Sequence, residues 1–177
     1  MQLSRVIKPV KLLLIALKTG RVSREKYPLG PPLITDSFRG AISIDPVKCR
    51  GCGACVLICP PNALTLRFEG EKAILEYFKG RCIFCGMCAD VCPVQAITVT
   101  REFELATVEV EDLKEEIVHV MSKCIMCGRP FETITQLKYV KELKLITEKY
   151  MNMCPECRSK RVAKLLAMKP GEIFEIK

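Results

Sequence analysis

Eight cysteines form two copies of one ligand pattern, 33 residues apart. The first copy is Cys49, Cys52, Cys55, Cys59 and Pro60, and the second is Cys82, Cys85, Cys88, Cys92 and Pro93. Each copy reads C-x2-C-x2-C-x3-C-P, a spacing with which thiolates hold a [4Fe–4S] cluster. Two such clusters in one chain predict the transfer of single electrons.

The spacing also predicts which cysteines share a cluster. Three thiolates separated by two-residue gaps can wrap one corner of a cubic cluster, and in this motif the fourth cysteine ligates the other cluster. We therefore expect cluster 1 on Cys49, Cys52, Cys55 and Cys92, and cluster 2 on Cys82, Cys85, Cys88 and Cys59. The alternatives are a disulfide framework and a pair of zinc sites. The many CxxC steps without a secretory signal disfavour disulfides, and zinc does not use this spacing.

The remaining four cysteines predict a second kind of metal site. Two CxxC pairs, separated by 26 residues, are typical of a tetrahedral four-thiolate site for Zn²⁺: Cys124, Cys127, Cys154 and Cys157. The Gly after Cys127 and the C-P-x-C form of the second pair also fit a rubredoxin-like site for a single iron. Spacing leaves both metals open, and we favour structural zinc. The only histidine, His119, is expected on a helix surface and not as a ligand.

The elements that position these ligands fall into three predicted segments. Residues 1–40 form an amphipathic arm with an extended connector at 27–32, residues 41–110 a domain with two clusters, and residues 111–177 a C-terminal metal-binding module. Apolar periodicity and turn residues predict short strands at 41–44, 64–68, 73–77, 97–100 and 103–110, with a hairpin turn at 69–71. The same criteria predict helices at 113–121, 133–150 and 159–168, and an extended end at 173–176.

The N-terminal arm is basic and apolar. Residues 1–40 hold eight Lys or Arg against two Asp or Glu, and Leu12–Leu17 is an apolar run too short to span a bilayer. It also lacks the small-residue cleavage site of a signal peptide. A helix of this kind can lie on a membrane surface, dock on a partner or pack within its own domain.

Other functions find less support in the residues. No acid/base pair or glycine-rich phosphate loop lies beside the cluster motifs, so the sequence predicts no catalytic residues and no nucleotide or flavin site. A zinc-ribbon nucleic-acid-binding protein is an alternative, but the basic residues Lys160, Arg161 and Lys164 lack an aromatic platform for base stacking. A freely diffusing ferredoxin would need neither the arm nor the second metal site.

Several segments outside the cluster motifs carry a family resemblance. With the motifs and the basic N-terminal helix, Tyr27–Pro28 and Phe38–Arg39–Gly40 resemble the two-cluster (TYKY-type) subunit of respiratory complex I. Cys82-Ile-Phe-Cys85-Gly86, Glu102–Ala106 and the C-terminal cysteine quartet resemble the ferredoxin-like subunit of formate hydrogenlyase and related membrane-bound [NiFe]-hydrogenases. Complex I subunits of this type lack the quartet, so we favour the hydrogenase branch.

The resemblance implies an α+β fold. A bacterial-type two-[4Fe–4S] ferredoxin core would carry an N-terminal amphipathic helix and a small, helical four-cysteine module. It implies an electron-relay subunit that is not an enzyme on its own. Its partners would be [NiFe]-hydrogenase-like small and large subunits, an iron–sulfur or flavin input subunit, and membrane-arm subunits reached through the N-terminal helix, without nucleic acid. It would lie peripherally on the cytoplasmic face of the membrane. A membrane-bound sulfane-sulfur reductase or complex I itself would use the same relay, and a reductase subunit with its own substrate is a further alternative.

Overall fold

The chain divides into two units, Met1–Phe38 and Arg39–Lys177. The computed structural model describes residues 3–19, 29–30, 32, 34–143 and 148–167. The expected extended end at 173–176 and half of the connector at 27–32 (residues 27, 28 and 31) lie outside the described residues.

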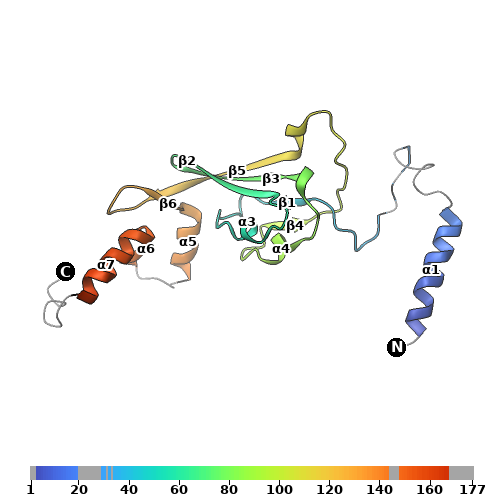
Figure 1. Ribbon diagram of the computed structural model, residues 1–177, viewed down its shortest axis with the longest axis horizontal. Coiled ribbons are helices and arrows are strands. Elements are labelled where there is room, and N and C mark those ends of the chain that lie inside the picture. The colour runs from blue at the N-terminus through green and yellow to red at the C-terminus, as the bar shows by residue number, and fades with distance from the viewer. Residues whose placement is uncertain (1–2, 20–28, 31, 33, 144–147, 168–177) are drawn as a thin grey trace. The chain divides into compact units, whose positions relative to one another are not determined.

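The first unit contains the predicted N-terminal helix α1 (Leu3–Thr19), with Pro9 inside it (Figure 1). Apolar side chains in the second half of this helix are exposed, with Leu12 66%, Leu13 60% and Leu17 72% accessible. Among the described residues, no helix is both long and apolar enough to cross a membrane.

In the second unit, two short strands and two short helices repeat around the cysteine motifs. Strand β1 (Ile42–Ile44) pairs antiparallel with β4 (Ile97–Val99), with Ile44 opposite Ile97. Helix α3 (Ala54–Ile58) contains the third cysteine of the first motif, and α4 (Met87–Asp90) contains the third cysteine of the second. The 33-residue repeat of the sequence is therefore also a repeat of structure.

A four-stranded antiparallel sheet covers this core in the order β2-β3-β5-β6 (Figure 1). Strands β2 (Leu64–Glu69) and β3 (Lys72–Phe78) form the predicted hairpin, and a single 3-10 turn, η1 (Lys79–Arg81), follows. Strand β5 (Lys114–Lys123) pairs with β3 from Lys114 to Val120, and its last three residues pair with β6 (Pro130–Thr133). The sheet thus crosses the predicted boundary between residues 110 and 111, and that boundary stays a prediction.

Strand β5 corrects the expectation of a helix at 113–121. The spacing of its apolar residues suits a helix, but Ile117, Val118 and Val120 are β-branched, and pairing with β3 satisfies the backbone. Exposure alternates along 116–121, as a strand requires. His119 therefore points inward and is only 6% exposed, so its expected place on a helix surface was wrong.

The strand expected at 103–110 is also absent. Residues 101–109 form no strand, and the 3-10 turn η2 (Val110–Leu113) follows them. Val108 and Val110 are exposed, so this apolar run has no sheet to join.

The C-terminal helices differ in extent from the predicted ones. The expected helix at 133–150 corresponds to α5 (Ile134–Glu142) and α6 (Glu148–Met151), and α7 (Pro155–Ala167) includes most of the last predicted helix. Thr133 caps α5, because its hydroxyl accepts a hydrogen bond from the Gln136 amide at 3.2 Å.

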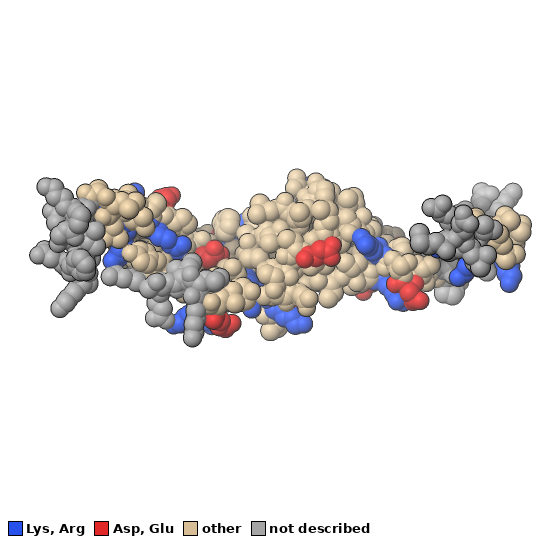
Figure 2. Space-filling view, turned by 90° about the horizontal axis from the view of Figure 1, so that it is seen from below, with Lys and Arg blue, Asp and Glu red and all other residues tan. Residues whose placement is uncertain are grey.

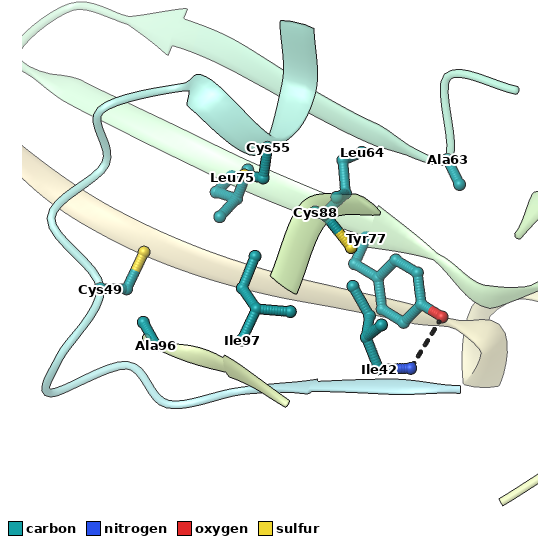
Figure 3. Close-up of a cluster of buried hydrophobic side chains, with 10 residues drawn as sticks. All are labelled: Ile42, Cys49, Cys55, Ala63, Leu64, Leu75, Tyr77, Cys88, Ala96 and Ile97. Carbon is teal, nitrogen blue, oxygen red and sulfur yellow. Dashed lines mark hydrogen bonds between the residues drawn. The ribbon is translucent and has the colours of Figure 1, made fainter. Parts of the chain in front are cut away.

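The main core lies between the sheet and the cysteine motifs. Figure 3 shows three buried cysteines, Cys49, Cys55 and Cys88, among apolar side chains that include Leu64, Leu75 and Ile97. Tyr77 is fully buried there, and its hydroxyl accepts a hydrogen bond from the Ile42 amide at 3.4 Å.

Candidate metal centres

The first candidate site is a pocket at the first cysteine motif. Three cysteines of the first motif and the last cysteine of the second motif line it: Cys49, Cys52, Cys55 and Cys92. Leu75 from β3 and the segment Pro93–Ile97 contribute much of the remaining lining, which is largely apolar. The structure therefore brings together the four cysteines expected for cluster 1.

The second candidate site is a pocket with the complementary set of cysteines. Its lining includes Cys59 from the end of the first motif, together with Cys82, Cys85 and Cys88. Ile42, Leu64 and Tyr77 form much of the apolar lining. The two motifs thus exchange their fourth cysteines between the cavities.

Both exchanged cysteines have the same local geometry. The Ala63 amide donates a hydrogen bond to Cys59 Sγ at 3.3 Å, and the Ala96 amide donates to Cys92 Sγ at 3.2 Å. Each amide lies four residues after its cysteine. A backbone N–H aimed at sulfur stabilises the thiolate, which is the form that binds metal.

The backbone around both motifs repeats as well. Positive φ angles recur 33 residues apart, at Gly53 (74°) and Gly86 (80°), and at Asn62 (52°) and Gln95 (50°). The first pair precedes the two short helices and is glycine in both motifs, which suits a left-handed backbone. One site has been built twice.

Burial opposes ionisation of three ligand thiols. Loss of hydration raises the pKa of Cys55 to about 12 and that of Cys88 to about 11, and it also raises the pKa of Cys49. Buried thiolates at these positions need a compensating positive charge, which an iron core supplies. Because the cavities are lined by four cysteines each and are otherwise largely apolar, the residues present fit two iron–sulfur clusters.

The third candidate site lies in the C-terminal module and is much tighter. The sulfur atoms of the quartet all lie within 4.8 Å of one another: Cys124, Cys127, Cys154 and Cys157. Cys127 Sγ and Cys154 Sγ are 3.7 Å apart. A tetrahedral ion with metal–sulfur bonds of about 2.3 Å places its ligands about 3.8 Å apart, so the quartet fits one ion.

The tightness separates the quartet from the cluster cysteines. Among the described residues, no other group of three or more Cys, His, Asp or Glu brings its ligand atoms this close.

Hydrogen bonds prepare the quartet for a cation. The Cys154 amide donates to Cys124 Sγ at 3.2 Å and is the main reason that the pKa of Cys124 falls to about 6. The Arg129 amide lowers the pKa of Cys127, whereas a hydrogen bond with Cys154 raises that of Cys157 to about 12. A bound cation would displace the protons of these thiols. Arg129 also forms an ion pair with Glu156, which links the first CxxC pair of the quartet to the second.

Sequence reasoning missed the residues that hold the ligand loops from outside. Arg39 Nη1 donates to the carbonyl oxygen of Cys85 at 2.8 Å, and Thr133 Oγ1 donates to that of Arg50 at 2.5 Å. The imidazole of His119 lies against the first ligand loop. Arg39 belongs to a segment that carried the family resemblance, but no spacing rule pointed to His119 or Thr133.

Comparison with known proteins gives one family. The 4Fe-4S dicluster domain matches residues 48–96 and 81–132. The chain is 36% identical to formate hydrogenlyase subunit 6 of Escherichia coli (strain K12) over 156 residues, which cover 82% of this chain and 86% of that protein.

Two further proteins show a more limited similarity. F(420)H(2) dehydrogenase subunit I of Methanosarcina mazei is 38% identical over 64 residues, which are 36% of each chain. A chain of the membrane-bound sulfane sulfur reductase, an archaeal respiratory membrane complex, aligns with 69% of this chain and 66% of its own length, at 22% identity and a TM-score of 0.35.

Proposed function

The chain belongs to the family of formate hydrogenlyase subunit 6 and carries a 4Fe-4S dicluster domain, and we propose that it relays single electrons through two [4Fe–4S] clusters. It is an electron-transfer subunit of a larger oxidoreductase and not an enzyme on its own. The parent complex is membrane-bound and related to formate hydrogenlyase.

The observation that carries this proposal is the pair of four-cysteine cavities. Each offers four sulfur ligands to one cluster, so every iron corner has a protein ligand and none is left for a substrate. A bound cluster supplies the capacity to accept and release one electron. The protein contributes the ligands, the amides directed at sulfur and the apolar walls, which together set the potential.

We assign the ligands in the crossed arrangement. Cluster 1 takes Cys49, Cys52, Cys55 and Cys92, and cluster 2 takes Cys59, Cys82, Cys85 and Cys88. The linings of the two cavities support this assignment. Because Cys55 and Cys59 are only four residues apart and bind different clusters, electrons pass between neighbouring centres.

The C-terminal quartet binds one Zn²⁺ ion in this proposal. Its sulfur spacing supports a single tetrahedral ion, and four protein thiolates make a closed, structural site. An isolated iron would occupy the same geometry, so metal analysis distinguishes the two.

Helix α1 is the attachment to the membrane arm of the complex. Its exposed Leu12, Leu13 and Leu17 need an apolar cover, and Lys8, Lys11 and Lys18 suit an anionic lipid surface at its edge. Hydrogenase-like small and large subunits and an electron-input subunit complete the assembly, on the cytoplasmic face.

A nucleic-acid-binding role has little support. On the face shown in Figure 2, charged side chains are scattered among uncharged ones and do not form one continuous basic surface. Lys160 and Lys164 on α7 lie beside the apolar Met126 and Leu165, and among the described residues no tryptophan, tyrosine or phenylalanine lines this hollow. The neighbouring Arg161 already covers the ring of Tyr150, 5.6 Å from its centroid.

Metal analysis of the anaerobically purified full chain tests the proposal. We expect about eight iron atoms and one zinc per chain, with the electron paramagnetic resonance of two interacting reduced clusters. A count of nine iron atoms and no zinc would mean that the quartet binds a single iron instead of zinc. Fewer than two cubic clusters in intact protein would refute the relay.

Exchange of single ligands tests the crossed assignment. Cys92→Ser should alter the resonance of cluster 1, and Cys59→Ser should alter that of cluster 2. If each substitution disturbs only the cluster of its own motif, the assignment is wrong although the relay stands.

A further inference from the structure

The loop between the first two ligands of cluster 1 is held by the C-terminal part of the chain. Thr133 Oγ1 donates a hydrogen bond to the carbonyl oxygen of Arg50 at 2.5 Å, and Thr135 Oγ1 donates to the same oxygen at 3.0 Å. The guanidinium of Arg50 lies over the ring of Tyr139, 3.6 Å from its centroid. The backbone and the side chain of Arg50 are thus both fixed by residues far along the chain.

The next residue of the loop is in even closer contact. Gly51 is buried with φ +68°, and a Cβ added to it would lie 2.8 Å from His119 Cδ2 and 2.9 Å from Thr133 Cγ2. His119 is 6% and Thr133 2% exposed, so both side chains are enclosed where they meet the loop. No side chain larger than hydrogen fits between the loop and these two residues.

The equivalent loop of cluster 2 has no such cover. Ile83 and Phe84 stand where the first motif has Arg50 and Gly51, and Ile83 is 61% exposed. Phe84 keeps a positive φ of 56° but carries a large side chain. Among the described residues, no hydrogen bond joins β5 or β6 to this loop, and Arg39, which precedes both motifs, donates to the Cys85 carbonyl at its end.

The residues that hold the first loop flank the four-cysteine site. Strand β5, which carries His119, ends at Lys123 directly before Cys124. Strand β6, which ends at Thr133, follows the first CxxC pair of the quartet, Cys124 and Cys127. Met121 and Thr133 are paired across the two strands. The segment with Cys124 and Cys127 is therefore the turn of the β5–β6 hairpin, and this hairpin contacts the cluster 1 loop through His119 and Thr133.

The second half of the quartet holds this turn in place. The Ile125 amide donates to the carbonyl oxygen of Asn152 at 3.0 Å, and the Cys154 amide donates to Cys124 Sγ. An ion bound by all four sulfurs would lock the turn to the segment around Cys154. The order of the hairpin would then depend on the occupancy of the site.

We propose that the four-cysteine module is a brace for cluster 1 and not for cluster 2. Metal binding in the quartet fixes the β5–β6 hairpin, and the brace residues His119, Thr133, Thr135 and Tyr139 then hold the Arg50–Gly51 loop in the conformation that cluster 1 requires. By linkage, loss of the quartet metal loosens cluster 1 selectively. This inference rests on the ligand assignment proposed above.

The test uses the anaerobic full chain with all three sites loaded. An iron chelator is added, and cysteines released from each cluster are alkylated with iodoacetamide and located by mass spectrometry. Thr133→Val removes the hydroxyl that donates to Arg50, and Thr133→Ser restores it. Thr100→Val is the matched control, because Thr100 Oγ1 makes a similar 2.6 Å hydrogen bond to the Ala41 carbonyl, away from the loop.

We expect Thr133→Val to release the cluster 1 cysteines about fivefold faster than the parent or more, because it removes the hydrogen bond to Arg50 and also the cap of α5, the helix that carries Tyr139. The release of cluster 2 cysteines, the Thr133→Ser variant and the Thr100→Val variant should match the parent. Cys157→Ser, which disables the quartet, should accelerate release from cluster 1 in the same selective way.

Equal acceleration at both clusters, or no acceleration at either, in Thr133→Val would overturn the brace. Normal retention of cluster 1 in Cys157→Ser would also overturn it. Selective release of Cys49, Cys52 and Cys55 together with Cys59 instead of Cys92 would support the brace and refute the crossed assignment, so the two proposals fail separately.

Discussion

Substitution of Gly51 by alanine is the sharpest test of how closely the first ligand loop is covered. The added methyl group would stand 2.8 Å from His119 Cδ2 and 2.9 Å from Thr133 Cγ2. Neither neighbour can withdraw easily, because His119 is buried and Thr133 is held by its hydrogen bond to Arg50. The backbone at φ +68° adds a second cost.

The two costs can be separated with Gly70→Ala. Gly70 has a similar φ of +59°, but an added Cβ there has nothing within 4 Å. A left-handed alanine costs roughly 1–2 kcal/mol at either position. Overpacking adds roughly 1–3 kcal/mol at Gly51 alone. For a domain of this size, the packing cost lowers the melting temperature by roughly 2–12 °C.

The assay is thermal unfolding of the cluster-loaded protein under anaerobic conditions, followed by circular dichroism at one fixed heating rate. Gly51→Ala should melt below Gly70→Ala by the stated margin. The cost of Gly51→Ala should also shrink in a His119→Ala background, because the imidazole no longer obstructs the methyl group. Equal melting temperatures for the two glycine variants would refute the close contact between loop and strand.

Three further outcomes follow from single contacts. Leu75→Ala should destabilise the protein by about 2–5 kcal/mol, because Leu75 is 2% exposed in the core. Leu57→Ala, at a residue 90% exposed, is the control and should change stability by about 0.5 kcal/mol or less. Similar losses of unfolding free energy in the two variants would contradict this. Arg39→Gln removes the guanidinium that donates a hydrogen bond to the Cys85 carbonyl, so the cluster 2 cysteines should be released, and therefore alkylated, about fivefold faster. Release of the cluster 1 cysteines should be unchanged and is the internal control. Burial lowers the pKa of His119, so the unfolded chain binds a proton more readily and stability falls as pH drops below about 6.5. The melting temperature of His119→Gln should lose this fall between pH 8 and pH 5.5. An equal fall in parent and variant would argue against a role for His119.

Much of the core could be predicted from local patterns. The hairpin of β2 and β3 follows from two apolar runs around a Glu-Gly-Glu turn, and the short strands β1 and β4 lie where expected. These elements are specified within a few residues of chain, so their pattern is visible before any tertiary contact is known.

Strand β5 shows where local patterns fail. Leu113, Ile117, Val120 and Met121 satisfy a helical spacing, yet the segment is a strand because β3 offers a pairing partner along its length. Intrinsic preference is weak for a short apolar run, and the neighbouring strand decides. The error also misplaced His119, since a strand alternates its faces and turns this residue inward.

The sequence by itself determined which residues are the proposed ligands: twelve cysteines in two spacings, because a metal site built from residues close in sequence has a characteristic spacing along the chain. Only the tertiary structure decided what stands around those ligands. Arg50 and Thr133 are 83 residues apart, and their contact exists because β5 pairs with β3 in one register and carries the hairpin onto the loop. Such a contact depends on the register and packing of whole strands, which no local spacing records.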